Sequence, residues 1–370
     1  MALQSTYGPE LSLIVTTYNE SENIISLVER VHESLAQYSY ELIVVDDNSP
    51  DGTAELAQGL VASYPLRVIV RTNEQGMASA VVAGFNQAGG AMLGVIDADL
   101  RYPPEMIPVL VEEIRHGADV AIASRYVEGG GMEGGSVTRE FISRVARLPV
   151  SLLLPSTRGI RDPLAGLFLF KRDVIDGVAL APTGYKILLE VLVKGKPRQV
   201  VEIPYTFKEK GESRRAFKDG INSLIHLSRL AWAEGEVKRF LKFCTVGASG
   251  TVVYLGLLSL LTEVGGLYYI LSAALGYEVS ILTNFTLNEL WTFRDRRSSG
   301  QRWSVLTRAV KFNIVSLGGL AIHEAVLFFF TEFVGLFYIA SAIFGIATAV
   351  LWNFFVNVGW TWRQEKEIGL

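Results

Sequence analysis

The sequence contains a single cysteine, Cys244, which excludes an internal disulfide framework. It also lacks a basic excess: the formal net charge is −4, so nothing indicates nucleic acid as a partner. Residues 1–10 lack the basic start and apolar core of a signal peptide, and we expect the first domain to stay in the cytoplasm. No Ser-His-Asp or Cys-His set and no Walker-type glycine-rich loop is present. The chemistry of this chain must come from other groups.

Apolar residues are unevenly distributed, and the mean hydropathy of +0.30 is high for a soluble protein. Polar and charged residues fill the first two-thirds of the 370 residues, whereas long apolar runs dominate from Phe240 onward. We predict a cytoplasmic domain over residues 1–215, an amphipathic interfacial segment over 216–239 and a transmembrane domain over 240–370. The alternative for residues 216–239 is a soluble helix packed on the first domain.

Short apolar segments alternate with helical patterns in the first domain, which predicts an α/β fold with a Rossmann-like, mostly parallel sheet. Ligands of such sheets bind at the carboxyl ends of the strands. Acidic or amide residues follow three predicted strands, at Asn19-Glu20, Asp46-Asp47 and Asp97-Ala98-Asp99. Each group alone is typical of a helix cap or a solvated turn. Three groups at one edge predict a nucleotide site.

Asp97 and Asp99 are separated by one residue at the end of the apolar segment 91–96. Side chains alternate along a strand, so these two carboxylates point the same way. Mg²⁺ and Mn²⁺ prefer carboxylate and phosphate oxygens, and we predict that the pair binds one of these cations. The alternative is that the two aspartates only open the turn before Pro103-Pro104.

Several ordered motifs lie between residues 11 and 215: TTYNE at 16–20, VVDDNSPDGT at 44–53, GMASAVVAGF at 76–85, DADLRYPPE at 97–105 and ASRY at 123–126. Together they resemble the family-2 glycosyltransferases, which have a GT-A fold. A second group comprises DPLAGLFLFKR at 162–172, GYKILLE at 184–190, EIPYTF at 202–207 and GES at 211–213. This group narrows the resemblance to polyprenyl-phosphate glycosyltransferases, most of all the dolichyl-phosphate mannose synthases.

The resemblance implies a role for each matching residue. Asp97 and Asp99 would bind the metal that bridges the donor diphosphate, and Ser143 would lie near the acceptor phosphate. The remaining residues would contact the donor or the phosphates. Those assigned to the base, ribose and donor pocket are Thr17, Tyr18, Glu20, Asp46, Asp47, Ala98 and Arg101, and those assigned to the phosphates or the acceptor are Arg125, Arg139, Lys186, Lys210 and Arg214. For the basic residues the alternative is a solvated surface charge.

The sequence departs from the family pattern at two places. Family members commonly carry Gln two residues after the second aspartate, but Arg101 stands there, and a cation cannot be a metal ligand. Arg101 would either contact phosphate directly or leave the metal with fewer protein ligands. The second departure is a shorter loop after Phe207, in which Lys210 and Arg214 replace an Arg and a Lys. Because Lys cannot reproduce the bidentate geometry of Arg, the acceptor contacts there are open.

Four apolar segments, at about 240–262, 267–290, 307–331 and 336–360, are long enough to cross a bilayer. The second pair repeats the first at an offset of 69 residues, which predicts a duplicated helical hairpin resembling the GtrA-like membrane domain. The loops near Glu263 and Glu332 carry no Lys or Arg. By the positive-inside rule, we expect the catalytic domain and both termini in the cytoplasm. The basic residues between the hairpins are Arg294, Arg296, Arg297, Arg302, Arg308 and Lys311.

These features predict a membrane-bound, metal-dependent, inverting transferase that moves a hexose from a nucleotide sugar to a polyprenyl phosphate. Mannose from GDP-mannose to dolichyl phosphate is the first interpretation. A UDP-glucose-dependent polyprenyl-phosphate glucosyltransferase is the second. A protein that binds or translocates glycolipid through its membrane half, with a weak catalytic domain, is an alternative from another class, and Arg101 favours it.

Overall fold

The computed structural model describes residues 8–73, 75–133, 150–151, 153–180, 186–208, 216–296 and 302–363. The chain forms two compact units, residues 1–234 and residues 235–370.

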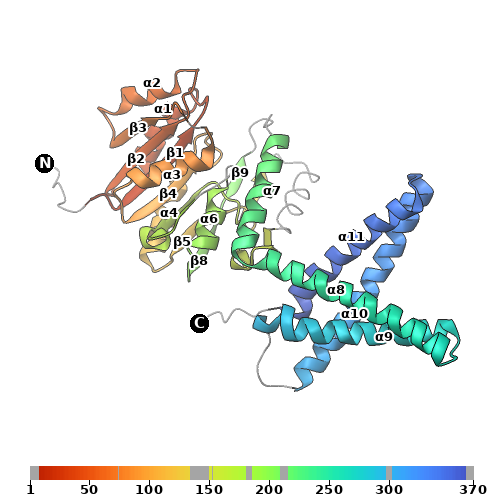
Figure 1. The fold of residues 1–370 in the computed structure, drawn as a ribbon. Helices are drawn as coiled ribbons and strands as arrows, with labels where there is room; N and C mark the ends of the chain where they lie inside the picture. The colour runs from red at the N-terminus through yellow and green to blue at the C-terminus, as the bar shows by residue number, and fades with distance from the viewer. Residues whose placement is uncertain are drawn as a thin grey trace. The chain divides into compact units, whose positions relative to one another are not determined.

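The first unit is built on a seven-stranded sheet (Figure 1) with the strand order β3-β2-β1-β4-β7-β5-β8. Only β7 runs antiparallel to its neighbours, so the predicted mostly parallel sheet is confirmed. Its central strands are buried on both faces, which explains why their sequences are continuous apolar runs. The strands are β1 (Leu11–Thr17), β2 (Tyr40–Asp46), β3 (Leu66–Val70), β4 (Met92–Asp97), β5 (Val120–Ser124), β7 (Phe168–Lys171) and β8 (Val200–Pro204); β6 (Gly131–Glu133) and β9 (Thr206–Lys208) form a separate parallel pair.

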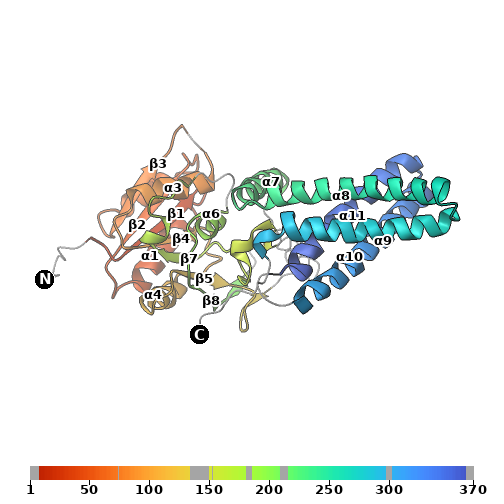
Figure 2. The same cartoon turned by 60° about the horizontal axis from the view of Figure 1, so that its bottom comes forward.

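Helices cover both faces of this sheet (Figure 2) and make two apolar cores. On one face lie α1 (Ile24–Ser34), α2 (Thr53–Leu60) and α4 (Ile107–Arg115). On the other lie α3 (Met77–Gln87) and α6 (Ile187–Lys194). Gly84 lets α3 approach β1 closely, since a Cβ there would lie 2.7 Å from Ile14 Cγ2.

The strand order reverses between β1 and β4. The chain passes from β1 to β2 and β3 on one side and then returns to place β4 on the other side of β1. Connecting loops diverge at such a point and leave a crevice at the carboxyl ends of the two strands. Glu20 follows β1 and Asp97 ends β4, so the acids singled out in the sequence lie at this position.

Helix α7 (Ala216–Ala233) completes the first unit. Leu230 and Ala231 are buried, and His226 and Arg229 contact Glu190 of α6. Ile225 and Trp232 are exposed. One face of α7 therefore packs on the protein while apolar side chains remain outside; the interfacial role of residues 216–239 stays a prediction.

The second unit consists of two helical hairpins, α8 (Glu236–Ser259) with α9 (Tyr269–Leu287) and α10 (Arg302–Phe328) with α11 (Tyr338–Val356). Each helix continues into a π-helical turn. In the part of the chain that the structure describes, four stretches are long and apolar enough to cross a membrane, as the sequence predicted: Glu236–Val264, Tyr269–Thr292, Val305–Phe333 and Tyr338–Thr361.

The hairpins repeat each other in detail. The π-helical turns Leu260–Val264 and Asn288–Thr292 recur at Phe329–Phe333 and Asn357–Thr361, at the offset read from the sequence. Lys242 lies 5.4 Å from the Trp291 ring, and Lys311 lies 5.3 Å from the Trp360 ring. The predicted duplication is therefore present in the structure, down to single side-chain contacts.

Candidate active site

The acidic pair Asp97 and Asp99 lies at the carboxyl end of β4. Burial raises the pKa of Asp97 to about 7, and the negative charge of Asp99 adds to this effect. Asp99 accepts a hydrogen bond from the backbone N–H of Arg101 at 3.1 Å and forms an ion pair with the Arg101 Nε at 3.1 Å. The pair is thus a concentration of negative charge that a cation would stabilise.

The antiparallel strand β7 brings a glycine against the first aspartate. Because Val95 of β4 pairs with Phe168 of β7, the same register places Gly166 opposite Asp97. A Cβ on Gly166 would overlap the Asp97 carboxylate. The Gly166 backbone N–H donates to the Tyr102 hydroxyl at 2.7 Å, and Tyr102 stacks on Tyr205 with the ring centroids 4.9 Å apart. These contacts fix the position of Asp97.

Glu20 and Lys186 approach the same acids from β1 and α6. Burial raises the pKa of Glu20, and Asp99 contributes to the shift, whereas Asn23 opposes it by donating to Glu20 at 2.8 Å. Lys186 donates to the Leu164 carbonyl at 3.2 Å, and its charge partly offsets the raised pKa of Asp97. The carboxyl ends of β1 and β4 therefore bring together three carboxylates and two cationic side chains.

The acids that follow β2 are engaged differently. Asp46 is fully buried and accepts bonds from the Thr17 hydroxyl at 2.7 Å and from the Ser49 hydroxyl and N–H at 2.6 and 2.8 Å. Asp46 therefore connects the end of β1, through Thr17, to the loop after β2, through Ser49. Asp47 accepts from Arg71 and from the Gly76 N–H at 2.7 Å.

Arg125 follows β5 and is held by a buried carboxylate. Its Nε and Nη2 donate to Asp162 at 2.8 and 2.9 Å, a bidentate geometry, and the Asp162 N–H donates to Glu202 at 2.8 Å. Although burial lowers the pKa of Arg125, the bonds to Asp162 outweigh it and raise the pKa above its usual value. Arg125 is therefore a permanent cation in a fixed orientation.

The residues at the β4 end fit a divalent cation of the Mg²⁺ type. Among the residues that the structure describes, no group of three or more His, Cys, Asp or Glu side chains could hold a metal. Mg²⁺ often takes only one or two carboxylates and fills its remaining positions with water and substrate phosphates. Two aspartates that interact electrostatically, one of them directly against Gly166, match that donor set.

Comparison with known families identifies both parts of the chain. Residues 12–177 match the model of glycosyl transferase family 2, and residues 242–364 match that of the GtrA/DPMS transmembrane domain. A dolichol-phosphate mannosyltransferase from Pyrococcus furiosus is 42% identical over 355 residues, 95% of this chain and 99% of the relative. The chain belongs to glycosyltransferase family 2, and it is an integral membrane protein.

A second curated protein and a solved structure are similar to part of the chain. A dolichol-phosphate mannosyltransferase from Saccharomyces cerevisiae is 36% identical to this glycosyltransferase over 236 residues, which are 60% of this chain and 86% of the relative. Among solved structures, mannosyl-3-phosphoglycerate synthase from Rubrobacter xylanophilus is 19% identical, with a TM-score of 0.48 over 62% of this chain and 75% of that chain.

The glycosyltransferase unit brings five of the predicted site residues to the switch point, namely Glu20, Asp97, Asp99, Arg101 and Lys186. Tyr18 is half-buried beside Glu20, and Ala98 is buried between the aspartates. Asp46 and Asp47 lie at the end of β2, next to β1, and Arg125 follows β5, which β7 separates from β4. The predictions for Arg139, Ser143, Lys210 and Arg214 lie outside the described residues.

Four residues that position the site residues had no role predicted from the sequence, namely Arg71, Tyr102, Asp162 and Gly166. Arg71 follows β3 directly, as the acids follow β2 and β4, so its place at a strand end could have indicated it. Asp162 and Gly166 lie in the DPLAG motif, but their partners come from β5 and β4.

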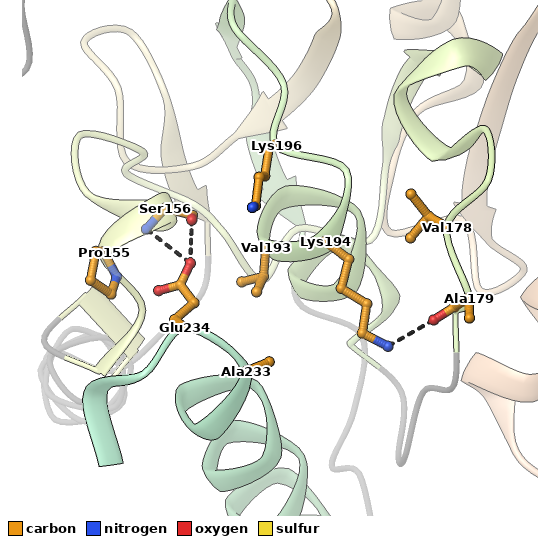
Figure 3. Close-up of a pocket in the computed structure, with 9 residues that line it drawn as sticks. All are labelled: Pro155, Ser156, Val178, Ala179, Val193, Lys194, Lys196, Ala233 and Glu234. Atoms are coloured by element: carbon orange, nitrogen blue, oxygen red, sulfur yellow. Dashed lines mark hydrogen bonds between the residues drawn. The ribbon is translucent and has the colours of Figure 1, made fainter. Parts of the chain in front are cut away.

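A cavity of about 530 Å³ lies elsewhere in the same unit (Figure 3). Lys194, at the end of α6, lines it together with Glu234, which accepts a bond from Ser156. Lys186 immediately precedes the opposite end of α6, so this cavity is separate from the acidic site.

Proposed function

We propose that this glycosyltransferase moves mannose from GDP-mannose to dolichyl phosphate, with inversion at the anomeric carbon and with Mg²⁺ or Mn²⁺ as cofactor. The acidic pair at the switch point carries the proposal, because it can hold a cation where a nucleotide diphosphate would lie. The similarity to the Pyrococcus furiosus mannosyltransferase over nearly the whole of both chains supports the choice of sugar and acceptor.

The residues have distinct tasks in the proposed reaction. Asp97 and Asp99 would hold the cation, which when bound neutralises charge on the departing diphosphate. Lys186 approaches the same acids and would add positive charge beside the phosphates. Arg125, oriented by Asp162, would donate to a phosphate oxygen of the substrates. These fixed cations stabilise the charge that develops as the bond to the sugar breaks.

The acceptor explains why no general base is needed. A lipid phosphate is already ionised near neutral pH, so it can attack the sugar without first losing a proton to the protein. None of the four histidines, His32, His116, His226 and His323, follows a strand of the acidic edge. One direct displacement inverts the anomeric centre.

The membrane unit supports a lipid acceptor and a cytoplasmic catalytic unit. Basic residues gather between the hairpins, including Arg296 and Arg308, whereas the short turns at Gly266 and Gly335 carry none. By the positive-inside rule, the segment between the hairpins and both termini lie in the cytoplasm. A cysteine introduced near Gly266 or after α11, in a Cys244→Ser background, would test this by labelling with an impermeant reagent in sealed vesicles.

Transfer of labelled sugar into an extractable lipid tests the proposed function. Purified protein would receive GDP-mannose or UDP-glucose with dolichyl phosphate, in Mg²⁺, Mn²⁺ or EDTA. We expect a mannolipid that EDTA and Asp99→Asn abolish, while Asp176→Asn, at an exposed aspartate outside the site, leaves it unchanged. A glucolipid from UDP-glucose would replace the proposed donor by the second interpretation.

The pairing of Arg101 with Asp99 gives the alternative function a specific basis, because a cation on a metal ligand weakens a metal site. If folded protein makes no labelled lipid from either donor but still moves glycolipid between vesicle leaflets, it is a glycolipid translocator with a weak catalytic unit.

A further inference from the structure

Arg101 lies where it can compete with a metal ion. Its Nε is 3.1 Å from Oδ2 of Asp99, while its backbone N–H donates to Oδ1 of the same carboxylate. Both carboxylate oxygens of Asp99 are thus engaged by one residue. The charge of Arg101 is also within electrostatic range of Asp97 and Glu20, so it acts on the whole acidic cluster.

The ion pair is partly exposed and can open. The side chains of Arg101 and Asp99 are 29% and 30% exposed, although the Arg101 Nε itself is buried, and partly solvated ion pairs are weak. A diphosphate offers a guanidinium two or more anionic oxygens, which match its planar donors as well as a carboxylate does. A nucleotide diphosphate could therefore bind the Arg101 guanidinium in place of Asp99 with a small loss of free energy.

We propose that Arg101 is a positioning residue that keeps Asp99 from binding a divalent cation until a nucleotide diphosphate draws the guanidinium away. Metal and nucleotide then bind with positive coupling, because each favours the state in which the Arg101–Asp99 pair is open. This inference rests on the proposed metal and nucleotide site, but not on the identity of the sugar or of the lipid.

The coupling has a measurable size. Removing the competing guanidinium should tighten binding of Mn²⁺ alone roughly tenfold, an order of magnitude consistent with an ion pair in a partly solvated site. Coupling between ligands is reciprocal, so Mn²⁺ should enhance GDP affinity less in the variant than in the wild type, by about the same factor.

The first measurement uses Mn²⁺ alone and full-length protein in detergent, with free Mn²⁺ followed by electron paramagnetic resonance. Wild type, Arg101→Met, Arg101→Lys and Arg115→Met would be compared after thermal melting shows that each is folded. Met removes the charge without adding the amide oxygen that family members carry at this position. Arg115→Met is the matched control, because it removes one charge from a pair with Glu10, which precedes β1 at the opposite edge of the sheet. We expect tighter Mn²⁺ binding only in Arg101→Met, since Lys keeps the charge.

The second measurement is calorimetric titration with GDP and with UDP, in EDTA and at saturating Mn²⁺. A smaller Mn²⁺ effect on nucleotide affinity in Arg101→Met supports the proposal. Unchanged Mn²⁺ affinity in Arg101→Met overturns it, and so does an equal gain in Arg101→Lys. Failure of the proposed sugar transfer would leave both readouts intact, so the two failures can be told apart.

Discussion

Two pairs of aspartates lie at the carboxyl ends of β2 and β4, the strands on either side of β1, and their surroundings differ. Asp46 and Asp47 follow β2 and are satisfied by hydroxyls, backbone N–H groups and Arg71. Asp97 ends β4 and Asp99 lies two residues on, and the pKa of Asp97 is raised first by burial and then by the charge of Asp99. One pair completes the protein's own hydrogen bonds, whereas the other leaves negative charge for a ligand to neutralise.

The surroundings of the carboxylates differ. Asp46 is the last residue of β2 and accepts from Thr17 of β1, whereas Asp47 lies just beyond the strand and accepts from Arg71 after β3. Asp97 ends β4, and Asp99 lies in the turn after it, where Arg101 is its partner and its charge raises the pKa of Asp97. Similar composition therefore supports the loop framework at one strand end and the proposed cation site at the other.

The largest effect is expected at Asp97 and Asp99. Asp97→Asn or Asp99→Asn should reduce sugar transfer about 100- to 1,000-fold, the range typical of removing one group that stabilises developing charge. Stability should not fall, because each change relieves repulsion between carboxylates. Transfer assays and thermal melting in detergent check this. A large loss of stability in either variant would make this pair structural, like the pair after β2.

The glycine opposite Asp97 tests whether that carboxylate must keep its position. Gly166→Ala places a methyl group where the Asp97 carboxylate lies, and we expect roughly a hundredfold loss of transfer from its displacement. Gly59→Ala in α2 is the control, because a Cβ there meets nothing within 4 Å. Equal activities of the two alanine variants would contradict this role of Gly166.

Substitution of the aspartates at the end of β2 should lower the stability of the fold and not only the rate of sugar transfer. Asp46→Ala leaves the Thr17 and Ser49 donors without their buried acceptor, and we expect a loss of about 2 kcal/mol in the free energy of unfolding. Denaturant titration measures this loss. Unchanged stability together with abolished donor binding would instead assign Asp46 to the nucleotide, as the family resemblance implies.

Much of this organisation could be predicted from the sequence, because it depends on local periodicity. Alternating apolar segments gave the parallel sheet, the acids after β1, β2 and β4 gave the edge that holds the site, and an offset of 69 residues gave the duplicated hairpin. Each of these features is encoded within a short window of sequence, or by comparing two such windows.

The unpredicted parts depend on tertiary pairing. Gly166 meets Asp97 only because β7 inserts antiparallel between β4 and β5 in one register. Asp162 reaches Arg125 through the same insertion, since its loop leads into β7. A four-residue strand such as β7 has too few positions to show its direction or its partners in the sequence. The pairing of Arg101 with Asp99 is local, but only its geometry shows that both oxygens are engaged.

Glu190 of α6 is a third acid to compare with these pairs, and its substitution is expected to have the smallest effect. Burial raises the pKa of Glu190, but bonds from His226 and Lys194 outweigh it and lower the pKa to about 2, below the ordinary value of 4.5. The carboxylate therefore stabilises the fold above pH 4.5, and this contribution is lost as the pH falls toward 2.

Glu190→Gln should lower the free energy of unfolding by about 1 kcal/mol at pH 7, because Lys194 and Arg229 can still reach water. The difference from wild type, measured by denaturant titration, should shrink progressively below pH 4.5. A stability difference that stays constant down to pH 3 would contradict this prediction. It would show that Glu190 joins α6 to α7 through packing and not through its negative charge.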